Sequence, residues 1–360
     1  MMSEGDFPNH IRRAVALTHG EVAVPHILFH TVTAAGLLAG LAPTAAAILA
    51  TLGFQALAAW GVFWLARRSG APVAFATCVG IGMVWVAPIF PLEVAADAPL
   101  YPYGYFVPNA LHNPTVLAAK AFVPFLIVLG VMLTGASPTA SRSSSIAIVV
   151  ILAGLAKPHY VSCVLPVLAM VWAWRWWHGR QLSWRPILTF GIAAAAVLVW
   201  TAAGTVVLAG GGTPVVAPLA VLQTFGGEDI PVDALSIAAR AGSDLAFPIA
   251  VLILWPSARR FRPLLLAWAA YGLALAQVLL LAEAGGRMHD GNFMWSPQLA
   301  TFGVMAVSAA WVGRSSQRWN WRIVVASSVF VLHVAHGVWW IARRVGDADV
   351  PLNWLSLIAP

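Results

Sequence analysis

Charged side chains are scarce in this sequence. They make up 9% of its 360 residues, whereas hydrophobic residues make up 60%. A soluble globular domain carries about 25% charged residues, so the scarcity argues against one. Apolar runs of about 18 residues or more recur along the chain, and each is long enough to cross a bilayer as a helix. These runs lack the period-two alternation of barrel strands, so the sequence predicts an all-α, polytopic helical membrane protein.

Other absences exclude further classes. The glycine-rich phosphate-binding motifs of nucleotide-binding proteins are missing, which argues against an ATP-driven pump. The two cysteines, Cys78 and Cys163, lie inside apolar segments, so no disulfide framework is indicated. The net charge of +7 comes from arginines that fall in short clusters between spans and form no single patch. We therefore expect no nucleic-acid partner.

About ten helical passes are expected, several of them short. The spans run approximately over residues 43–66, 72–92, 115–135, 187–210, 246–258, 264–284, 296–312 and 323–342. Between the third and fourth spans, the dipeptide Lys157-Pro158 splits the apolar stretch 145–174. Because proline cannot donate a helix hydrogen bond, this stretch is expected to form two short helices, a hairpin within the membrane.

The arginines indicate an orientation. Alternating spans place twelve of them on one face, which predicts that this face is cytoplasmic. They are Arg67, Arg68, Arg142, Arg175, Arg180, Arg185, Arg259, Arg260, Arg262, Arg314, Arg318 and Arg322. Eight carboxylates fall on the opposite, outer side: Glu93, Asp97, Glu228, Asp229, Asp233, Asp244, Glu283 and Asp290. Acidic residues contribute little to topology, so their segregation predicts a polar site on the outer face.

The expected organisation has three parts. Residues 1–42 form an external N-terminal loop and an interfacial helix, residues 43–342 a transmembrane domain, and residues 343–360 a C-terminal tail. The external loops of the transmembrane domain are 93–114, 211–245 and 283–295. A second interpretation makes residues 25–41 a true span, which would place Asp6 in the cytoplasm. These 17 residues are at the lower limit for crossing, and the sequence leaves both interpretations open.

Candidate binding residues concentrate in the external stretches 6–21, 93–115 and 283–295. They are His112, Asn113, Arg287, His289, Asp290 and Asn292. Loops between membrane helices need polar residues in any case, so ordinary solvated loops are the alternative. Convergence of the three stretches on one face favours a site.

The lysines of the chain, Lys120 and Lys157, both lie within apolar segments. Ionisable residues at membrane depth are costly and indicate function. Both are candidates to bind an anionic group, such as a lipid phosphate, at the outer boundary; the alternative is that they extend to the interface. His26 and His30 share a helix face, but one histidine pair is not a metal site, so no metal is expected.

Several phrases resemble the GT-C superfamily of membrane glycosyltransferases. Asp6 stands ahead of AVALTHG at 14–20 and PHILFH at 25–30, and the first span ends in Arg67-Arg68. The Lys157-Pro158 break resembles a hairpin frequent in those enzymes. HNPT at 112–115 and DGNFMW at 290–295 resemble phrases of bacterial membrane proteins with this layout. The resemblance covers most of the chain in architecture, while each motif is short.

The resemblance implies sugar transfer from a polyprenyl-phosphate carrier to an acceptor, with inversion, at the outer face of the bacterial plasma membrane. Asp6 matches the general base of that family, and no cofactor is implied. Members of the family have a transmembrane helix ahead of the catalytic loop, so this chain is expected to be a divergent member without it. From their charge and depth, Lys120, Lys157 and Arg287 are expected to stabilise the departing phosphate.

Two alternatives come from other functional classes. A non-catalytic membrane subunit would keep the fold without the activity, and the missing first helix favours it. A transporter or flippase of a lipid-linked or polar substrate would need polar residues along a path through the membrane. The spans are almost free of carboxylates, and Gln55, Gln277 and the two lysines are their outstanding polar residues, which argues against transport.

Overall fold

Helices make up nearly all of the structure, a computed structural model, so the predicted all-α class is confirmed. The structure describes residues 6–21, 26–89, 109, 113–133, 141–180, 184–208, 214–224, 234–284, 292–317 and 320–346. The elements are α1 (Asp6–Thr18), α2 (Ile27–Leu38), α3 (Pro43–Arg68), α4 (Val73–Gly82), α6 (Pro114–Lys120), α7 (Val123–Leu133), α8 (Ser141–Ala156), α9 (His159–Trp177), α10 (Trp184–Leu208), β1 (Pro214–Val216), α11 (Ala220–Thr224), α12 (Ala234–Asp244), α13 (Ala246–Leu254), η1 (Pro256–Arg260), α14 (Arg262–Leu280), β2 (Leu281–Glu283), η3 (Asn292–Met294), α15 (Trp295–Ser315) and α16 (Trp321–Gly346).

Five helices of the described chain are long and apolar enough to cross a membrane. They are Pro43–Arg68, Pro114–Leu133, Trp184–Gly204, Arg262–Leu280 and Trp321–Ala342. A sixth span is possible if α12 and α13, which bend by 73° at their junction, count as one. Large apolar side chains are exposed on α3, α9, α10 and α16. Several membrane spans are therefore compatible with the fold, and the count of about ten passes stays a prediction.

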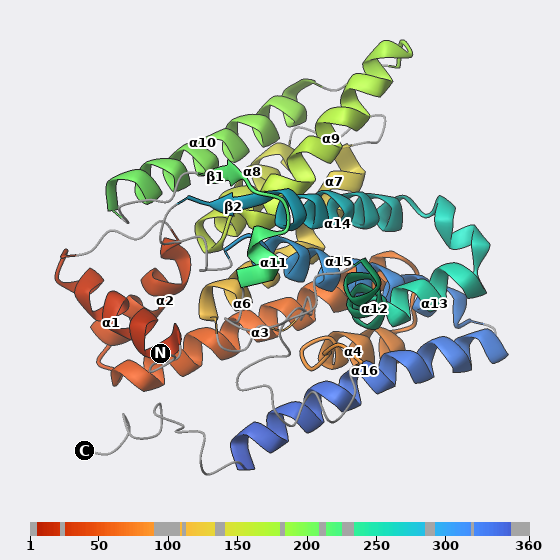
Figure 1. The fold of residues 1–360 in the computed structure, drawn as a ribbon, viewed down its shortest axis with the longest axis horizontal. Helices are drawn as coiled ribbons and strands as arrows, with labels where there is room; N and C mark the ends of the chain where they lie inside the picture. The colour runs from red at the N-terminus through yellow and green to blue at the C-terminus, as the bar shows by residue number, and fades with distance from the viewer. Residues whose placement is uncertain are drawn as a thin grey trace.

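The bundle is built around α15 (Figure 1). Nearly every residue of this helix is buried, and it packs against α3, α7, α9, α13 and α14. Small residues allow the close approach: a Cβ atom added at Gly313 would lie 2.6 Å from the Cβ of Ala71. Core packing at this density leaves little room for added atoms.

The predicted spans and the observed helices largely coincide. The expected break at Lys157-Pro158 is confirmed, since α8 ends at Ala156 and α9 begins at His159. Span 115–135 is divided into α6 and α7 around Phe122, and its two parts still pass as one apolar segment.

The predicted span 72–92 is wrong in its second half. Helix α4 ends at Gly82, and residues 83–89 form turns and coil. Long-range hydrogen bonds replace the helical ones in this segment. The Asn109 amide donates to the carbonyls of Met83 and Val86, at 3.1 and 2.8 Å. The backbone N–H of Ala87 donates to the carbonyl of His333 in α16, and Nδ1 of the His333 ring lies 2.6 Å from the carbonyl oxygen of Ala87. These partners satisfy backbone groups that the helix would otherwise satisfy internally.

The N-terminal segment differs from the loop predicted for it. Residues 6–18 form the amphipathic helix α1, which buries His10, Ile11 and Ala14 against α2 and α3. Helix α2 has 12 residues and is therefore about 18 Å long, well short of the roughly 30 Å of a hydrocarbon core. This length favours an interfacial or re-entrant α2 over a span.

Two other predicted boundaries need correction. The expected loop 211–245 contains β1, α11 and α12, and β1 pairs antiparallel with β2, so the helix predicted to reach residue 284 ends at Leu280. Helix α16 continues to Gly346, inside the predicted tail 343–360. The strand pairing explains the early end of α14, because residues 281–283 bond to β1 instead of the preceding turn.

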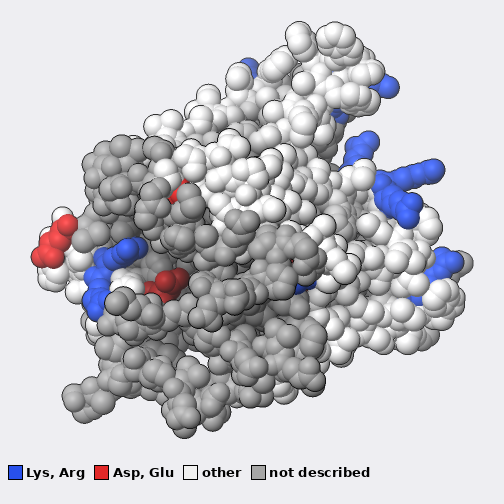
Figure 2. Space-filling model, in the orientation of Figure 1, with Lys and Arg blue, Asp and Glu red and all other residues white. Residues whose placement is uncertain are grey.

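Basic side chains are concentrated at one end of the bundle. Figure 2 shows several of them at the right-hand end, while the left half has acidic atoms together with a second basic group; α1 carries the exposed Arg12 and Arg13. We call the right-hand end the arginine end; it holds Arg68 of α3, Arg175 of α9, Arg262 of α14 and Arg314 of α15. Helices α9, α14 and α15 connect it to the opposite end, where α1 and α2 lie (Figure 1).

Candidate functional site

Lys157 is the centre of a polar cluster at the end of the bundle opposite the arginine end. It occupies the break between α8 and α9, and its side chain is 4% exposed. The residues around it come from seven elements, namely α1, α2, α6, α9, β2, η3 and α15. We call them the Lys157 cluster: Asp6, His10, His26, His30, Asn113, Thr115, Lys157, His159, Glu283, Asn292 and Trp295.

A chain of hydrogen bonds connects Lys157 to Asp6. The Lys157 ammonium donates to the Thr115 hydroxyl at 3.4 Å, and this hydroxyl donates to Oδ1 of Asn113 at 2.7 Å. The Asn113 amide nitrogen then donates to Oδ2 of Asp6 at 2.8 Å. Asn113 Oδ1 also caps α6 by accepting from the backbone N–H of Val116. The cap fixes the amide orientation, so its NH₂ group faces Asp6.

The start of α15 and strand β2 close the other side of the cluster. The Lys157 ammonium lies 4.5 Å from the centroid of the Trp295 ring, a cation–π contact. Asn292 donates to Oε2 of Glu283 at 2.8 Å. Both Asp6 and Glu283 lie within electrostatic range of Lys157. One of these carboxylates comes from the first helix and the other from β2.

Two histidine rings border Lys157 with unused ring nitrogens. The rings of His26 and His159 lie 6.2 Å apart, and His159 also bonds to the backbone of Asn292. The Nδ1 atom of each is buried and has no hydrogen-bond partner among the residues that the structure describes. Buried polar atoms are normally paired, so these two are available to a ligand or to water.

A second histidine pair supports helix α1. His10 Nδ1 and His30 Nε2 are 2.8 Å apart, and His30 Nδ1 lies 2.9 Å from the carbonyl oxygen of His26. Because that carbonyl can only accept, His30 carries its proton on Nδ1, and His10 donates to Nε2 of His30. Burial, with smaller contributions from His30 and Lys157, holds the pKa of His10 well below its usual value. His10 is therefore neutral at pH 7 and acts here as a hydrogen-bond donor.

This arrangement suits an anionic ligand and proton transfer. Lys157 supplies a positive charge that can attract an anion, and the neutral histidines add no charge of their own. Asp6, in the first turn of α1, is partly exposed. A partly exposed carboxylate held by Asn113 can accept a proton from a bound hydroxyl group.

Lys120 lies apart from this cluster. Its ammonium group is enclosed, donating to Oδ1 of Asn109 and lying 5.4 Å from the centroid of the Phe302 ring. Since Asn109 also holds the carbonyls of Met83 and Val86, Lys120 supports the end of α4. This environment is that of a structural lysine.

The predicted site residues divide into three groups. Asp6, Asn113, Lys157 and Asn292 come together in the Lys157 cluster, whereas Lys120 does not join it. Four others lie outside the described residues: His112, Arg287, His289 and Asp290. Among the described residues, no group of three or more His, Cys, Asp or Glu side chains is placed to hold a metal ion.

Sequence reasoning missed several members of the cluster. Thr115, His159 and Trp295 sit beside predicted residues, but their contacts to Lys157 depend on the packing of α6, α9 and α15. His10 could have been found, because His10, Ile11 and Ala14 share one face of a helix that starts at Asp6.

Comparison of the chain with protein-family models, with curated proteins and with solved structures finds no match.

Proposed function

We propose that this protein is a multi-pass membrane glycosyltransferase, similar to the GT-C superfamily, that transfers a sugar from a polyprenyl-phosphate carrier. In this proposal the chain makes about ten passes through a bacterial plasma membrane and the Lys157 cluster lies at the outer face. The observation that supports it is the Lys157–Thr115–Asn113–Asp6 chain, which couples a buried cation to a partly exposed carboxylate. In the sequence, the resemblance had assigned a role to Asp6, and charge and depth had assigned one to Lys157.

In the proposed reaction Asp6 accepts the proton of an acceptor hydroxyl group. The hydroxyl oxygen attacks the anomeric carbon of the sugar, the bond from that carbon to the phosphate oxygen breaks, and polyprenyl phosphate leaves with the bonding electrons. Negative charge grows on the phosphate, and Lys157 stabilises it. Asn113 holds the Asp6 carboxylate in place, since a general base must lie within hydrogen-bond reach of the proton it accepts.

Substitution of Asp6 tests this role. Membrane vesicles containing the protein would be supplied with radiolabelled polyprenyl-phosphate hexoses and pentoses, and transfer to acceptors would be measured. Asp6→Asn is expected to lower transfer by at least about 100-fold, the usual contribution of a general base, while binding of polyprenyl phosphate persists. Lys157→Gln is expected to weaken that binding as well.

Glu21→Gln is the matched control, because Glu21 is an exposed carboxylate just after α1. It should leave transfer unchanged. Full transfer by a normally folded Asp6→Asn protein would exclude Asp6 as the base. If the wild-type protein and all variants bound the carrier but transferred no sugar, the result would instead support a non-catalytic subunit.

One observation favours transport as a second candidate function. The buried helix α15 carries side-chain oxygens without hydrogen-bond partners among the described residues, on Ser296, Gln298, Thr301 and Ser308. Such atoms along a central helix could line a polar path. Transport would be measured as movement of a lipid-linked substrate across the membrane of vesicles. Loss of this movement in Gln298→Leu, with its retention in Asp6→Asn, would favour transport.

A further inference from the structure

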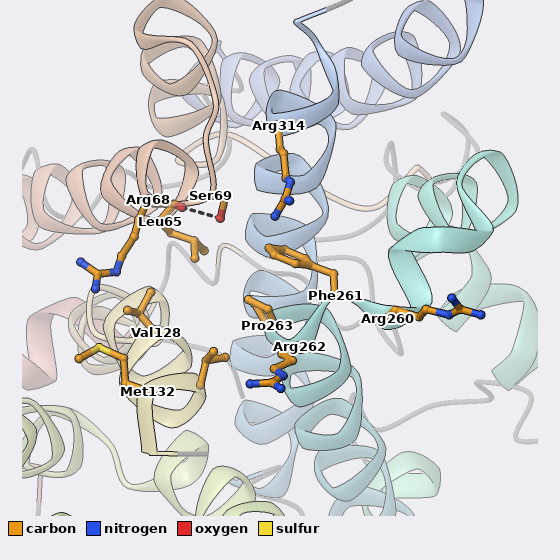
Figure 3. Close-up of a pocket in the computed structure, with 11 residues that line it drawn as sticks. Leu65, Arg68, Ser69, Val128, Met132, Arg260, Phe261, Arg262, Pro263 and Arg314 are labelled. Carbon is orange, nitrogen blue, oxygen red and sulfur yellow. Dashed lines mark hydrogen bonds between the residues drawn. The ribbon is translucent and has the colours of Figure 1, made fainter. Parts of the chain in front are cut away.

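The arginine end contains two adjoining pockets, far from the Lys157 cluster. The smaller, about 370 Å³, lies among the ends of α3, α7 and α15 and the start of α14 (Figure 3). The larger, about 950 Å³, lies between α9 and α14. Arg262 and Val131 line both pockets, so the two adjoin at the start of α14.

The larger pocket is lined by both arginines and apolar side chains. Arg175, Arg180 and Arg262 line it together with aliphatic side chains of α7, α9 and α14, among them Met170 and Leu265. Met170 and Leu265 are more than half exposed, at 57% and 53%, so the apolar part opens to the outside of the bundle. A free phosphate ion would use the arginines but not these apolar side chains.

The smaller pocket extends the positive surface. In Figure 3 the Arg262 side chain is directed toward Val128 and Met132 of α7, whereas Arg260 is directed away from the pocket. Arg314 enters from α15 and lies 5.9 Å from the centroid of the Trp311 ring. No carboxylate lines either pocket in the described part of the chain.

We propose that the groove between α9 and α14 binds an anionic phospholipid. Its phosphodiester lies against Arg175, Arg180 and Arg262, and an acyl chain lies along Val167, Met170 and Leu265. Arginine suits phosphate because its planar group makes paired hydrogen bonds, and basic pockets between membrane helices suit lipid headgroups. The proposal depends on membrane insertion alone and not on sugar transfer, so its failure would leave the Asp6 experiment unaffected.

Lipid binding would be measured on the full chain in detergent by native mass spectrometry. Phosphatidylglycerol and phosphatidylcholine are the probes, and inorganic phosphate is the competitor. The triple variant R175Q/R180Q/R262Q is expected to bind phosphatidylglycerol roughly 100-fold more weakly, about fivefold for each arginine near the headgroup. The matched control R185Q/R259Q/R322Q removes the same charge from exposed arginines that line neither pocket, and it should retain wild-type binding.

A second variant covers failure of the triple variant to fold. Ala269 is exposed and lines the larger pocket, so Ala269→Trp fills the groove while the three arginines remain. It is expected to lose the bound phosphatidylglycerol. Any one of four results would overturn the proposal. They are equal loss of binding in both arginine triple variants, equal binding of phosphatidylcholine and phosphatidylglycerol, full displacement of the lipid by millimolar phosphate, and unchanged binding in Ala269→Trp.

Discussion

At the scale of single residues, the two lysines show how burial alone fails to identify function. Both are almost fully buried, at 0% and 4% exposure for Lys120 and Lys157. Lys120 is enclosed by Asn109 and Phe302, which are structural partners. Lys157 lies within electrostatic range of two carboxylates and of two histidines with unused nitrogens. The neighbours of a buried lysine, and not its burial, therefore distinguish a structural residue from a candidate binding residue.

Asn113 offers a way to separate helix capping from positioning of Asp6. Asn113→Asp keeps the oxygen that caps α6 but loses the amide donor and places a second carboxylate beside Asp6. We expect Asn113→Asp to retain thermal stability close to wild type and to lose most transfer. Asn113→Ala should lose transfer and about 1 kcal/mol of stability, since the cap is removed. Thermal unfolding and the vesicle transfer assay are the two measurements; wild-type transfer by Asn113→Asp would show that Asp6 needs no partner.

His10 predicts a dependence of stability on pH. Its pKa is lowered in the folded protein, chiefly by burial, so the folded state keeps the ring neutral while the unfolded state takes up a proton below about pH 6.5. Stability is then fully present above that pH and falls as the pH drops toward the lowered pKa. For this group the loss is up to about 1.4 kcal/mol per pH unit. His10→Gln should show a shallower decline between pH 7 and 5 in thermal unfolding.

The exposed His19 provides the control for this experiment. His19→Gln should follow the wild-type pH profile. If His10→Gln lost stability with pH as steeply as the wild type, the contribution of the His10 ring would be disproved.

At the scale of elements, hydrophobic length predicted most helices well. The long spans α3, α14 and α16, and the break before Pro158, follow from apolar runs and one proline. Two elements could not be predicted in this way. Helix α4 stops at Gly82 because Asn109 and His333 bond to residues beyond it, and such partners are distant in sequence. Helix α1 was missed because its polar composition masked a one-sided pattern of burial.

The same limit applied to the candidate site. The family resemblance singled out Asp6, and charge and depth singled out Lys157, but neither predicted the hydrogen-bond chain that joins the two residues. The Thr115 hydroxyl joins the two ends of that chain, and threonine is common in helices without any such role. Its contribution depends on the packing of α6 against α1 and α8.

The central helix α15 predicts a strict size limit at one glycine. A Cβ atom at Gly313 would lie 2.6 Å from the Ala71 Cβ and 2.6 Å from Cδ1 of Phe75. Gly313→Ala is therefore expected to destabilise the bundle by about 1–3 kcal/mol. Gly272→Ala on α14 is the control, because nothing lies within 4 Å of the added atom and alanine favours the helix. Thermal unfolding in detergent should show opposite shifts; equal shifts would contradict the packing described for α15.

At the scale of the whole molecule, the two sites lie at opposite ends of the same helices. Helix α15 has 21 residues and is therefore about 30 Å long, close to the thickness of a hydrocarbon core. It begins at Trp295 in the Lys157 cluster and carries Arg314 in its last turn. This geometry fits a membrane in which the arginine end faces the cytoplasm and the cluster faces outward.

The side on which the Lys157 cluster lies is the most direct test of this account, and cysteine labelling in intact cells measures it. With Cys78 and Cys163 replaced by alanine, single cysteines would be placed at the exposed positions His19, after α1, and Gln317, at the arginine end. A membrane-impermeant maleimide is predicted to label His19→Cys from outside, and Gln317→Cys after permeabilisation alone. Labelling of His19→Cys solely in permeabilised cells would place Asp6 in the cytoplasm and contradict transfer at the outer face.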